Sequence, residues 1–218
     1  MSTDWELFLD PYIQAVSELK VKFRGIRKQY QKQGMSSPIE FVTARVKSVE
    51  SILKKAKTRM MNMEHLEKEM QDIAGLRIMV QFVEDIQAVL NLLRLRQDFK
   101  IVYERDYITN KKVSGYRSYH LVIEYPVQTL QGEKKILAEV QLRTLAMNFW
   151  ATIEHSLNYK YKGAIPEDLK MRLKHSAETA HLLDQEMSEI REEIQEAQRL
   201  IEPIRKNREE LDDDFKWY

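Results

Sequence analysis

Two acidic residues, Asp72 and Glu139, are the first candidates for chemistry in this sequence. Asp72 enters a run that has the composition of a buried strand, and Glu139 lies in a second strand-like run at residues 134–143. If the two strands are neighbours in a sheet, both carboxylates can reach one Mg²⁺ ion. Magnesium usually takes one or two protein carboxylates and completes its shell with phosphate oxygens and water. The pair therefore predicts a metal site.

The run at residues 134–143 alternates between apolar and polar side chains. Successive side chains of a strand point to opposite faces, so one face can cover a core while the other lines a cleft. An ordinary solvent-exposed sheet face has the same pattern, and the alternation alone leaves both interpretations open. The apolar face carries Ile136, Ala138, Val140 and Leu142, and the polar face carries Glu139, Gln141 and Arg143.

Cationic residues are frequent in the same segments. Acids that bind a metal among many cations are typical of polyphosphate sites, where transfer is catalysed by positioning and charge neutralisation. Tyr116 stands between Gly115 and Arg117 at the end of a polar loop, where its ring can stack on a base. The cations are Arg45, Lys47, Lys55, Arg77, Arg105, Lys112 and Arg143.

The composition excludes several other kinds of site. The 218 residues include no cysteine, which excludes a disulfide framework, a thiolate nucleophile and a cysteine-based zinc site. The motifs G-x-x-x-x-G-K-[ST], G-x-G-x-x-G and H-E-x-x-H are absent. We interpret the scattered histidines as surface or packing residues: His65, His155, His175 and His181.

The sequence predicts a soluble, cytoplasmic protein with no membrane partner. Residues 1–6 lack the basic flank and apolar run of a signal peptide. No apolar stretch approaches the roughly 20 residues that a membrane span needs. The net charge is +1 although 32% of residues are charged, so local clusters must identify the partners.

Hydrophobic periodicity predicts an α+β fold, with a small mixed sheet of about five strands flanked by helices, in one domain over residues 1–218. A capping box at Thr3–Glu6 starts a first helix, 5–32, with a break expected near Pro11. A second start signal at Ser37-Pro38 opens a helix to Lys57, within a core of residues 37–162. Strands follow at 72–82, 99–107, 121–125 and 134–143, and helices at 84–96, 145–161 and 166–206.

Both terminal helices carry surfaces that suggest partners. Lys20, Arg24 and Lys28 form a basic face that is either simply solvated or binds phosphates or single-stranded RNA. The last helix carries a heptad-like apolar seam, which predicts packing on the first helix or on another subunit. Pro203 is expected to end or kink this helix. The seam contains Leu173, Ala180, Leu183, Met187, Ile190, Ile194, Ala197, Ile201 and Ile204.

Four motifs in order resemble the synthetase domain of RelA/SpoT enzymes. They are Asp72-Ile-Ala-Gly-Leu-Arg77, Gly115-Tyr-Arg-Ser-Tyr-His120, Glu139-Val-Gln-Leu-Arg-Thr144 and Ala146-Met-Asn-Phe-Trp-Ala-Thr-Ile-Glu-His155. The length and helical ends resemble the stand-alone small alarmone synthetases of the RelQ type. The resemblance implies a nucleotidyltransferase-like fold that moves the β,γ-pyrophosphate of ATP to the 3′-hydroxyl of GDP or GTP. The products would be AMP and the stringent-response alarmones ppGpp or pppGpp.

The resemblance also implies a role for each matching residue. Asp72 and Glu139 would hold Mg²⁺, and Glu139 would also act as the base for the 3′-hydroxyl. At ATP, Arg45 and Arg77 would sandwich the adenine, while the phosphates would meet Lys47, Ser51 and Lys55. At GDP or GTP, Tyr116 would stack on guanine, and the remaining contacts would come from Arg105, Lys112, His120, Gln141, Asn148 and Glu154.

Assembly and regulation are further implications of the resemblance. Family members of this type form homotetramers, in which pppGpp or ppGpp can bind as an effector in a central cleft. The matching positions here are Lys20, Arg24, Phe41 and Thr43. The resemblance therefore implies that the basic face of the first helix binds an alarmone effector.

Two other functions remain open at this point. Some relatives transfer pyrophosphate to the 3′ end of tRNA, although the guanine-stacking position at Tyr116 argues against this acceptor. The chain could instead be a binding module in which the basic first helix captures RNA or alarmone and catalysis is secondary. RNA binding that depends on phosphate contacts should weaken steeply with salt.

Overall fold

The computed structural model describes residues 4–161 and 165–214, without the side chains of residues 159, 160 and 202–214. The helices are α1 (Trp5–Lys32), α2 (Val49–Thr58), α3 (Leu66–Glu69), α4 (Val83–Arg94), α5 (Leu145–Lys160) and α6 (Glu167–Asp214). The strands are β1 (Phe41–Val46), β2 (Ala74–Val80), β3 (Lys100–Asp106), β4 (Tyr119–Thr129) and β5 (Gly132–Thr144), and a short 3₁₀ turn, η1, spans Met63–His65.

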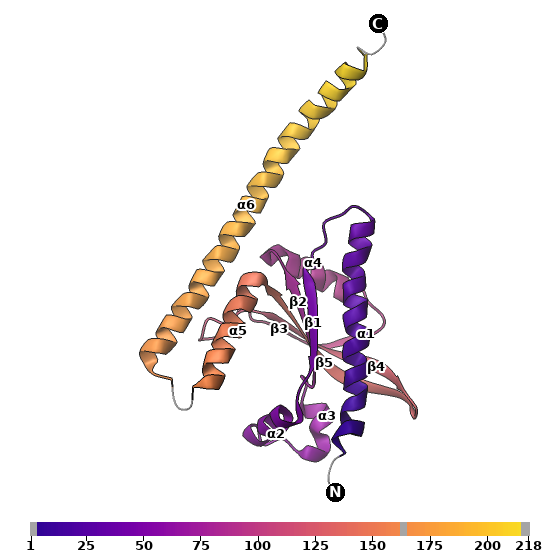
Figure 1. The fold of residues 1–218 in the computed structure, drawn as a ribbon, viewed down its shortest axis with the longest axis vertical. Coiled ribbons are helices and arrows are strands. Elements are labelled where there is room, and N and C mark those ends of the chain that lie inside the picture. Colours follow the sequence, from indigo (N-terminus) through magenta and orange to yellow (C-terminus); the bar gives the residue numbers. More distant parts are fainter. Residues whose placement is uncertain (1–3, 162–164, 215–218) are drawn as a thin grey trace.

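The strands form one mixed sheet in the order β1-β2-β5-β4-β3. The β2–β5 pair is parallel and the other pairs are antiparallel. Helix α1 covers one face of the sheet, and α5 and α6 lie on the opposite side (Figure 1). The predicted α+β class with a five-stranded mixed sheet is therefore confirmed.

Helix α1 is continuous, so the break expected near Pro11 is wrong. Asp4 caps the helix, its side chain accepting hydrogen bonds from the backbone amides of Glu6 and Leu7, whereas Thr3 of the expected capping box lies outside the described residues. Pro11 is buried within the helix together with Tyr12, Leu19 and Phe23. Burial of this apolar face offsets the roughly 3 kcal/mol that an interior proline costs a helix.

The helix expected from Ser37 to Lys57 is also wrong. Residues 41–46 form strand β1, and α2 begins only after Ser48, whose side chain accepts a hydrogen bond from the Ser51 amide. Val42 and its neighbours alternate between buried and more exposed positions along β1. Pairing with β2 and burial of Val42 in the core outweigh the helix-start signal at Ser37-Pro38, because that signal is local.

Helix α6 extends past Pro203 to Asp214, so the predicted end at this proline is wrong. The helix packs on α5 and α4 and not, among the described contacts, on α1 (Figure 1). Its inner side is partly polar: Asp184 accepts a hydrogen bond from the Thr144 hydroxyl, Ser188 donates to Glu84, and Arg191 pairs with Asp85.

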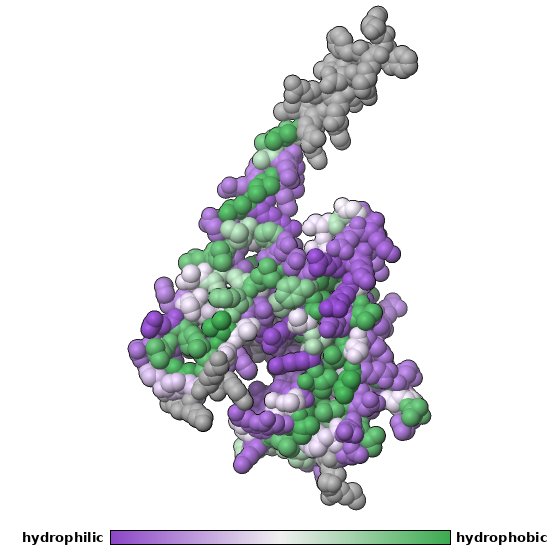
Figure 2. Space-filling model, in the orientation of Figure 1, coloured by the Kyte–Doolittle hydropathy of each residue, from purple (hydrophilic) through white to green (hydrophobic). Residues whose placement is uncertain are grey.

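The predicted seam of α6 is largely exposed to solvent. Leu183, Met187, Ile190 and Ile194 are between 38% and 53% exposed. Figure 2 shows apolar side chains along the part of α6 that projects beyond the body of the molecule. The side chain of Ile204 lies outside the described residues. In the part of the chain that the structure describes, no helix is both long and apolar enough to span a membrane.

Candidate active site

A row of five side chains crosses the whole sheet on the face opposite α1. Strand pairing places Thr43 opposite Arg77, Arg77 opposite Gln141, Gln141 opposite His120, and His120 opposite Arg105. Residues directly opposite one another on paired strands point to the same face. The strand order therefore gathers five predicted site residues that are up to 98 positions apart, from 43 to 141.

The next row contains the proposed base. Arg45 pairs with Gly75, and Gly75 pairs with Glu139. The side chains of Arg45 and Glu139 therefore lie on the same face of the sheet, on either side of Gly75. Here the sheet is hollowed into a pocket of about 180 Å³, which we call the carboxylate pocket. Its lining residues are Thr43, Ala44, Arg45, Asp72, Gly75, Leu76, Arg77, Glu139 and Gln141. The pocket contains both predicted metal ligands.

Asp72 is held between two lysines. Its Oδ2 lies 2.7 Å from Lys47 Nζ and its Oδ1 lies 2.7 Å from Lys55 Nζ. Burial alone would raise the pKa of Asp72, but the hydrogen bonds and charges of Lys47 and Lys55 outweigh burial and lower this pKa. Asp72 is therefore ionised at neutral pH, and it places two ammonium groups at the pocket.

Glu139 is held by His120 and Gln141. His120 Nδ1 is 3.1 Å from Glu139 Oε1, and Gln141 Nε2 donates to Glu139 Oε2 at 2.7 Å. Burial and the charge of Asp72 raise the pKa of Glu139. The interactions with His120 and Gln141 lower this pKa by a larger amount, so the net shift is downward. Glu139 is thus an ionised carboxylate that can accept a proton or bind a cation.

Tyr116 lies at the end of the polar loop and is partly buried. Its hydroxyl is 2.8 Å from His120 Nε2, and burial raises its pKa. Lys112 Nζ lies 4.7 Å from the ring centroid and Arg143 Cζ lies 5.1 Å from it. The ring therefore has cations beside it, and it packs against a small apolar cluster and not into the main core. The small cluster contains Trp150, Ala151 and Ala177.

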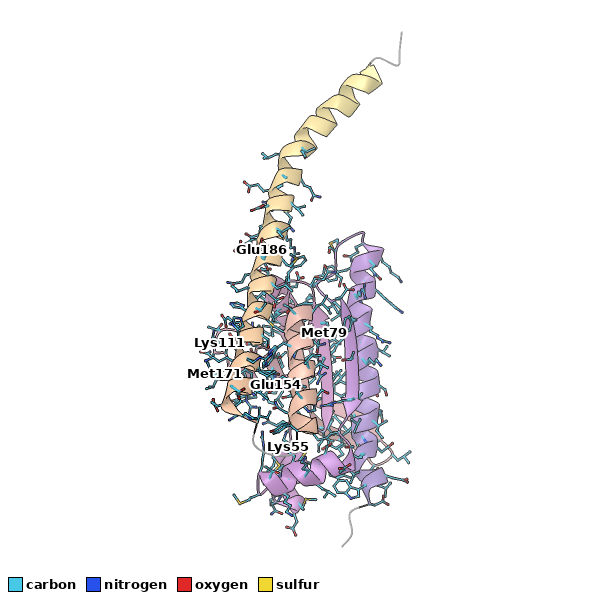
Figure 3. The ribbon with its side chains drawn as sticks, turned by 60° about the vertical axis from the view of Figure 1, so that its left-hand side comes forward. Lys55, Met79, Lys111, Glu154, Met171 and Glu186 are labelled. Carbon is cyan, nitrogen blue, oxygen red and sulfur yellow. The ribbon has the colours of Figure 1, made fainter. Side chains whose placement is uncertain are left out.

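A second hollow of about 460 Å³, which we call the tyrosine pocket, adjoins the first. Arg45, Arg77 and Gln141 line both pockets, so they form a shared wall. The other lining residues of the tyrosine pocket are Lys112, Ser114, Tyr116, Arg143, Ala151, Thr152, Glu154 and His155. Glu154 on α5 lies on the side of the sheet away from α1, above Lys55 on α2 (Figure 3).

The shared wall is positively charged. Burial lowers the pKa of Arg77, and the neighbouring guanidinium groups of Arg143 and Arg45 lower it further. Like charges held this close raise the free energy of the empty site, and a bound polyanion lowers it again. Two adjoining pockets with a shared basic wall can hold two anionic ligands side by side.

Several predicted site residues lie outside both pockets. Ser51 is exposed in the first turn of α2, where its hydroxyl accepts a hydrogen bond from Ser48. Arg105 contacts Gln71 and the Tyr103 ring. Asn148 on α5 has a buried Oδ1 that lacks a hydrogen-bond partner among the described residues. Their roles in nucleotide binding stay predictions.

The four predicted effector residues are not brought together within the described part of one chain. Lys20 and Arg24 lie on α1, which packs on the sheet face where Val42 is buried. Thr43 lines the carboxylate pocket on the opposite face, and Phe41 is 41% exposed on the same edge strand.

Sequence patterns missed some residues of the site. His155, interpreted above as a surface or packing residue, is exposed and lines the tyrosine pocket together with Ala151 and Thr152. Spacing could have suggested this, because residues 151 and 155 are one helical turn apart from each other and Glu154 precedes His155. Thr43 was predicted only as an effector position, and the structure places it in the carboxylate pocket.

Known proteins resemble this chain over most of its length. Residues 44–164 match the family described as "Region found in RelA / SpoT proteins". The chain is 60% identical over 206 residues to GTP pyrophosphokinase YjbM of Bacillus subtilis (strain 168), covering 94% of this chain and 97% of that one.

Solved structures give the same result. The fold matches small alarmone synthetase 1 from Bacillus subtilis bound to its product pppGpp with a TM-score of 0.86 and 61% identity, covering 89% of this chain and all of that one. The form of that enzyme bound to AMPCPP matches with a TM-score of 0.78 and 57% identity, over the same shares of the two chains.

Proposed function

The chain belongs to the RelA/SpoT family, and on that premise we propose that it transfers the pyrophosphate group of ATP to the 3′-hydroxyl of GDP or GTP. The observation that carries this proposal is the pair of adjoining pockets with Asp72 and Glu139 in the first and Tyr116 in the second. The products are AMP and the alarmones ppGpp or pppGpp. The RelA/SpoT resemblance found in the motifs is confirmed by the family match.

Glu139 acts as the general base in this proposal. Guanine stacks on Tyr116, and the 3′-oxygen attacks the β-phosphorus of ATP while Glu139 accepts the hydroxyl proton. The bond from the β-phosphorus to the oxygen that bridges the α- and β-phosphates breaks, and AMP leaves with that oxygen. Glu139 is ionised at neutral pH and can accept the proton, although its lowered pKa also makes it a weaker base than an unperturbed glutamate.

ATP binds against the carboxylate pocket and the shared wall. Arg45 and Arg77 stack on the adenine, and Lys47 and Lys55 neutralise phosphate charge near Asp72. Lysine acts as a point charge toward phosphate, so its ammonium can shift from Asp72 to a phosphate oxygen without a strict geometry. The tyrosine pocket accepts the guanosine nucleotide through Lys112 and the residues of α5.

Asp72 and Glu139 would hold Mg²⁺. Both carboxylates line one pocket, and they are close enough that the charge of Asp72 raises the pKa of Glu139. Among the residues that the structure describes, no group of three or more acidic, histidine or cysteine side chains could form a full protein cage. Two carboxylates fit magnesium, which completes its shell with phosphate and water oxygens and withdraws negative charge from the phosphates.

A nucleotide-product assay tests the proposal. The protein is incubated with ATP, GDP and Mg²⁺, and the nucleotides are separated. Wild type should accumulate ppGpp and AMP in equal amounts. Glu139→Gln should keep nucleotide binding and lose about 10²–10⁴-fold in kcat. Absence of both products with wild type refutes the transfer, and a fully active Glu139→Gln refutes the base assignment.

We also propose that the chains assemble, as a homotetramer, through the exposed seam of α6. Leu183 and Ile194 are each 53% exposed, and a contiguous exposed apolar stripe on a helix marks an interaction surface. Light scattering should give the tetramer mass for wild type and a smaller mass for Ile190→Glu and Ile194→Glu combined. Glu189→Gln on the same helix is the matched control.

Alarmone or RNA binding at the basic face is a separate proposal. Assembly could bring Lys20 and Arg24 of one chain to Phe41 and Thr43 of another, which a single chain does not do. Replacing Lys20, Arg24 and Lys28 by alanine should abolish stimulation by pppGpp if the face binds the effector. Single-stranded RNA should be retained less, with a weaker salt dependence, if phosphate contacts on this face carry the binding.

A further inference from the structure

The proposed base, Glu139, is one member of a closed ring of five hydrogen-bonded side chains. Arg143 Nη2 lies 2.6 Å from the Tyr116 hydroxyl and 2.7 Å from Gln141 Oε1. His120 bridges Tyr116 and Glu139, at 2.8 Å through Nε2 and 3.1 Å through Nδ1. Gln141 Nε2 closes the ring at 2.7 Å from Glu139 Oε2. Each oxygen of one carboxylate is thus connected to the same guanidinium nitrogen.

With Glu139 ionised and the His120 imidazole neutral, the chemistry of the groups gives one direction for every bond in the ring. An ionised Glu139 only accepts, so His120 donates through Nδ1, and a neutral imidazole then accepts at Nε2 from the Tyr116 hydroxyl. A guanidinium only donates, so Arg143 donates to the Tyr116 oxygen and to the Gln141 amide oxygen. The Gln141 amide nitrogen donates to Glu139.

Two donor branches therefore start at Arg143 and end on Glu139. One branch passes through Tyr116 and His120, and the other passes through Gln141. All donors and acceptors along them are matched, and such networks strengthen each bond and hold the side chains in one arrangement. Neither branch occupies both lone pairs of a Glu139 oxygen, so the carboxylate can still accept a proton.

Arg143 is itself fixed to the sheet. Its side chain is 4% exposed, and its Nε donates to the Ser118 hydroxyl at 3.3 Å. Ser118 in turn donates to the Leu142 carbonyl at 3.2 Å and is fully buried. The origin of both branches is thus anchored to backbone, which makes it a rigid reference for the carboxylate.

We propose that Arg143 and His120 are positioning residues that set the orientation of the Glu139 carboxylate and couple it to the guanine platform at Tyr116. This inference rests on the proposed function. The hydroxyl that His120 contacts belongs to the ring on which guanine stacks, so one network places both the purine and the base that deprotonates its nucleotide. Neither ring nitrogen of His120 is free, so a phosphate contact there would require one of these bonds to break.

Three conservative variants separate positioning from binding. Tyr116→Phe keeps the stacking ring and removes the hydroxyl. His120→Gln keeps a polar group near Nε2 and loses the bond to Glu139. Arg143→Lys keeps the charge and loses one branch. Each should lower kcat about 10–100-fold, because a misplaced reacting group costs about that much. The KM values for GDP and ATP should change less than about threefold, because the stacking ring and the wall remain.

Matched controls come from exposed residues of α6. Arg172→Lys and His175→Gln make the same chemical changes at exposed positions outside both pockets, and they should match wild type. Thermal unfolding of every variant identifies any that lose kcat only because they unfold. Tyr116→Phe removes a single oxygen, so it tests the network even if Arg143→Lys fails to fold.

A spectroscopic measurement tests the ring without turnover. The bond directions require that neutral His120 carries its proton on Nδ1. Nitrogen-15 spectra of histidine-labelled protein, with His120 assigned by the signal missing in His120→Gln, should show this tautomer. A proton on Nε2 overturns the proposed direction.

The outcomes distinguish this inference from the function on which it rests. If wild type forms neither AMP nor ppGpp, the proposed function fails. If wild type turns over and all three variants keep the kcat of the controls, the positioning role is refuted. If the variants raise KM for GDP while kcat stays at the wild-type value, the residues bind nucleotide and do not orient the base.

Discussion

Gly115 provides the sharpest test of how α6 supports the polar loop that ends at Tyr116, the residue proposed to stack on guanine. Its φ is +87°, and a Cβ added there would lie 2.6 Å from Ala177 Cβ on α6. Gly115 directly precedes Tyr116 in the chain, and Arg117 contacts the Ala177 carbonyl and Glu178. Substitution by alanine should therefore strain the backbone and push the loop away from α6.

The size of the effect follows from two separate costs. A left-handed conformation costs a residue with a Cβ about 1–2 kcal/mol. Forcing an extra methyl into a packed contact costs about 1–3 kcal/mol more. Gly34 has a φ of +67° but nothing within 4 Å of its added Cβ, so Gly34→Ala carries the first cost alone. We expect Gly115→Ala to destabilise by about 2–5 kcal/mol and Gly34→Ala by about 1–2 kcal/mol.

A double-mutant cycle isolates the contact with α6. Ala177→Gly removes the clashing methyl, after which the nearest atoms to the added Cβ are the Lys174 carbonyl oxygen at 3.6 Å and the Ala177 Cα at 4.0 Å. These are ordinary contacts, so Gly115→Ala with Ala177→Gly should recover about 1–3 kcal/mol relative to the sum of the single variants. The helix cost of glycine, about 1 kcal/mol, is measured in Ala177→Gly alone.

Denaturant unfolding at one fixed protein concentration measures the stabilities. The product assay should show that Gly115→Ala raises KM for GDP more than KM for ATP, because the loop carries Tyr116. The reasoning is refuted if Gly115→Ala is no less stable than Gly34→Ala. It is also refuted if removing the Ala177 methyl recovers no stability.

Two further predictions concern charges. Burial raises the pKa of Asp184 to about 6 despite the hydrogen bond from Thr144, so its contribution to stability is complete below about pH 3.8 and is lost as the pH rises through about 6. Asp184→Asn, which keeps the acceptor for Thr144, should be more stable than wild type by about 1–3 kcal/mol at pH 7.5, and urea unfolding should show the gap closing at pH 4; an equal gap at both pH values would contradict the cause. Lys55→Met should raise KM for ATP about 10–100-fold with little change in KM for GDP, since a charge-assisted hydrogen bond contributes about 1.5–3 kcal/mol. Lys57→Met, an exposed lysine on the same helix, should behave as wild type in that assay, and an equal effect at both lysines would show that Lys55 acts only through general charge.

Local patterns identified most elements because the two periodicities of side chains are local properties. The alternation from Ile136 to Arg143 is that of β5, whose apolar positions are buried. The same local reasoning failed at Ser37-Pro38, where a helix-start pattern precedes a strand. Residues 41–46 form a strand because they pair with β2, which follows them by about 30 positions. A pattern within residues 37–57 carries no information about that distant partner.

The candidate site shows the same division. The ordered motifs identified Asp72, Glu139 and Tyr116, and the structure places them at two adjoining pockets. The roles of Arg143 and His120 in the ring were not predicted. Arg143 contacts Tyr116, 27 positions earlier, only because β4 pairs with β5.

The sequence by itself determined which residues can do chemistry, since residue type, motif order and strand alternation are all written along the chain. The tertiary structure decided which of them meet. Strand β5 lies between β2 and β4, so Glu139 reaches Asp72 on one side and His120 on the other. Strand order and register are set by burial of whole faces of the sheet, and this free energy belongs to the assembled fold and not to any one segment.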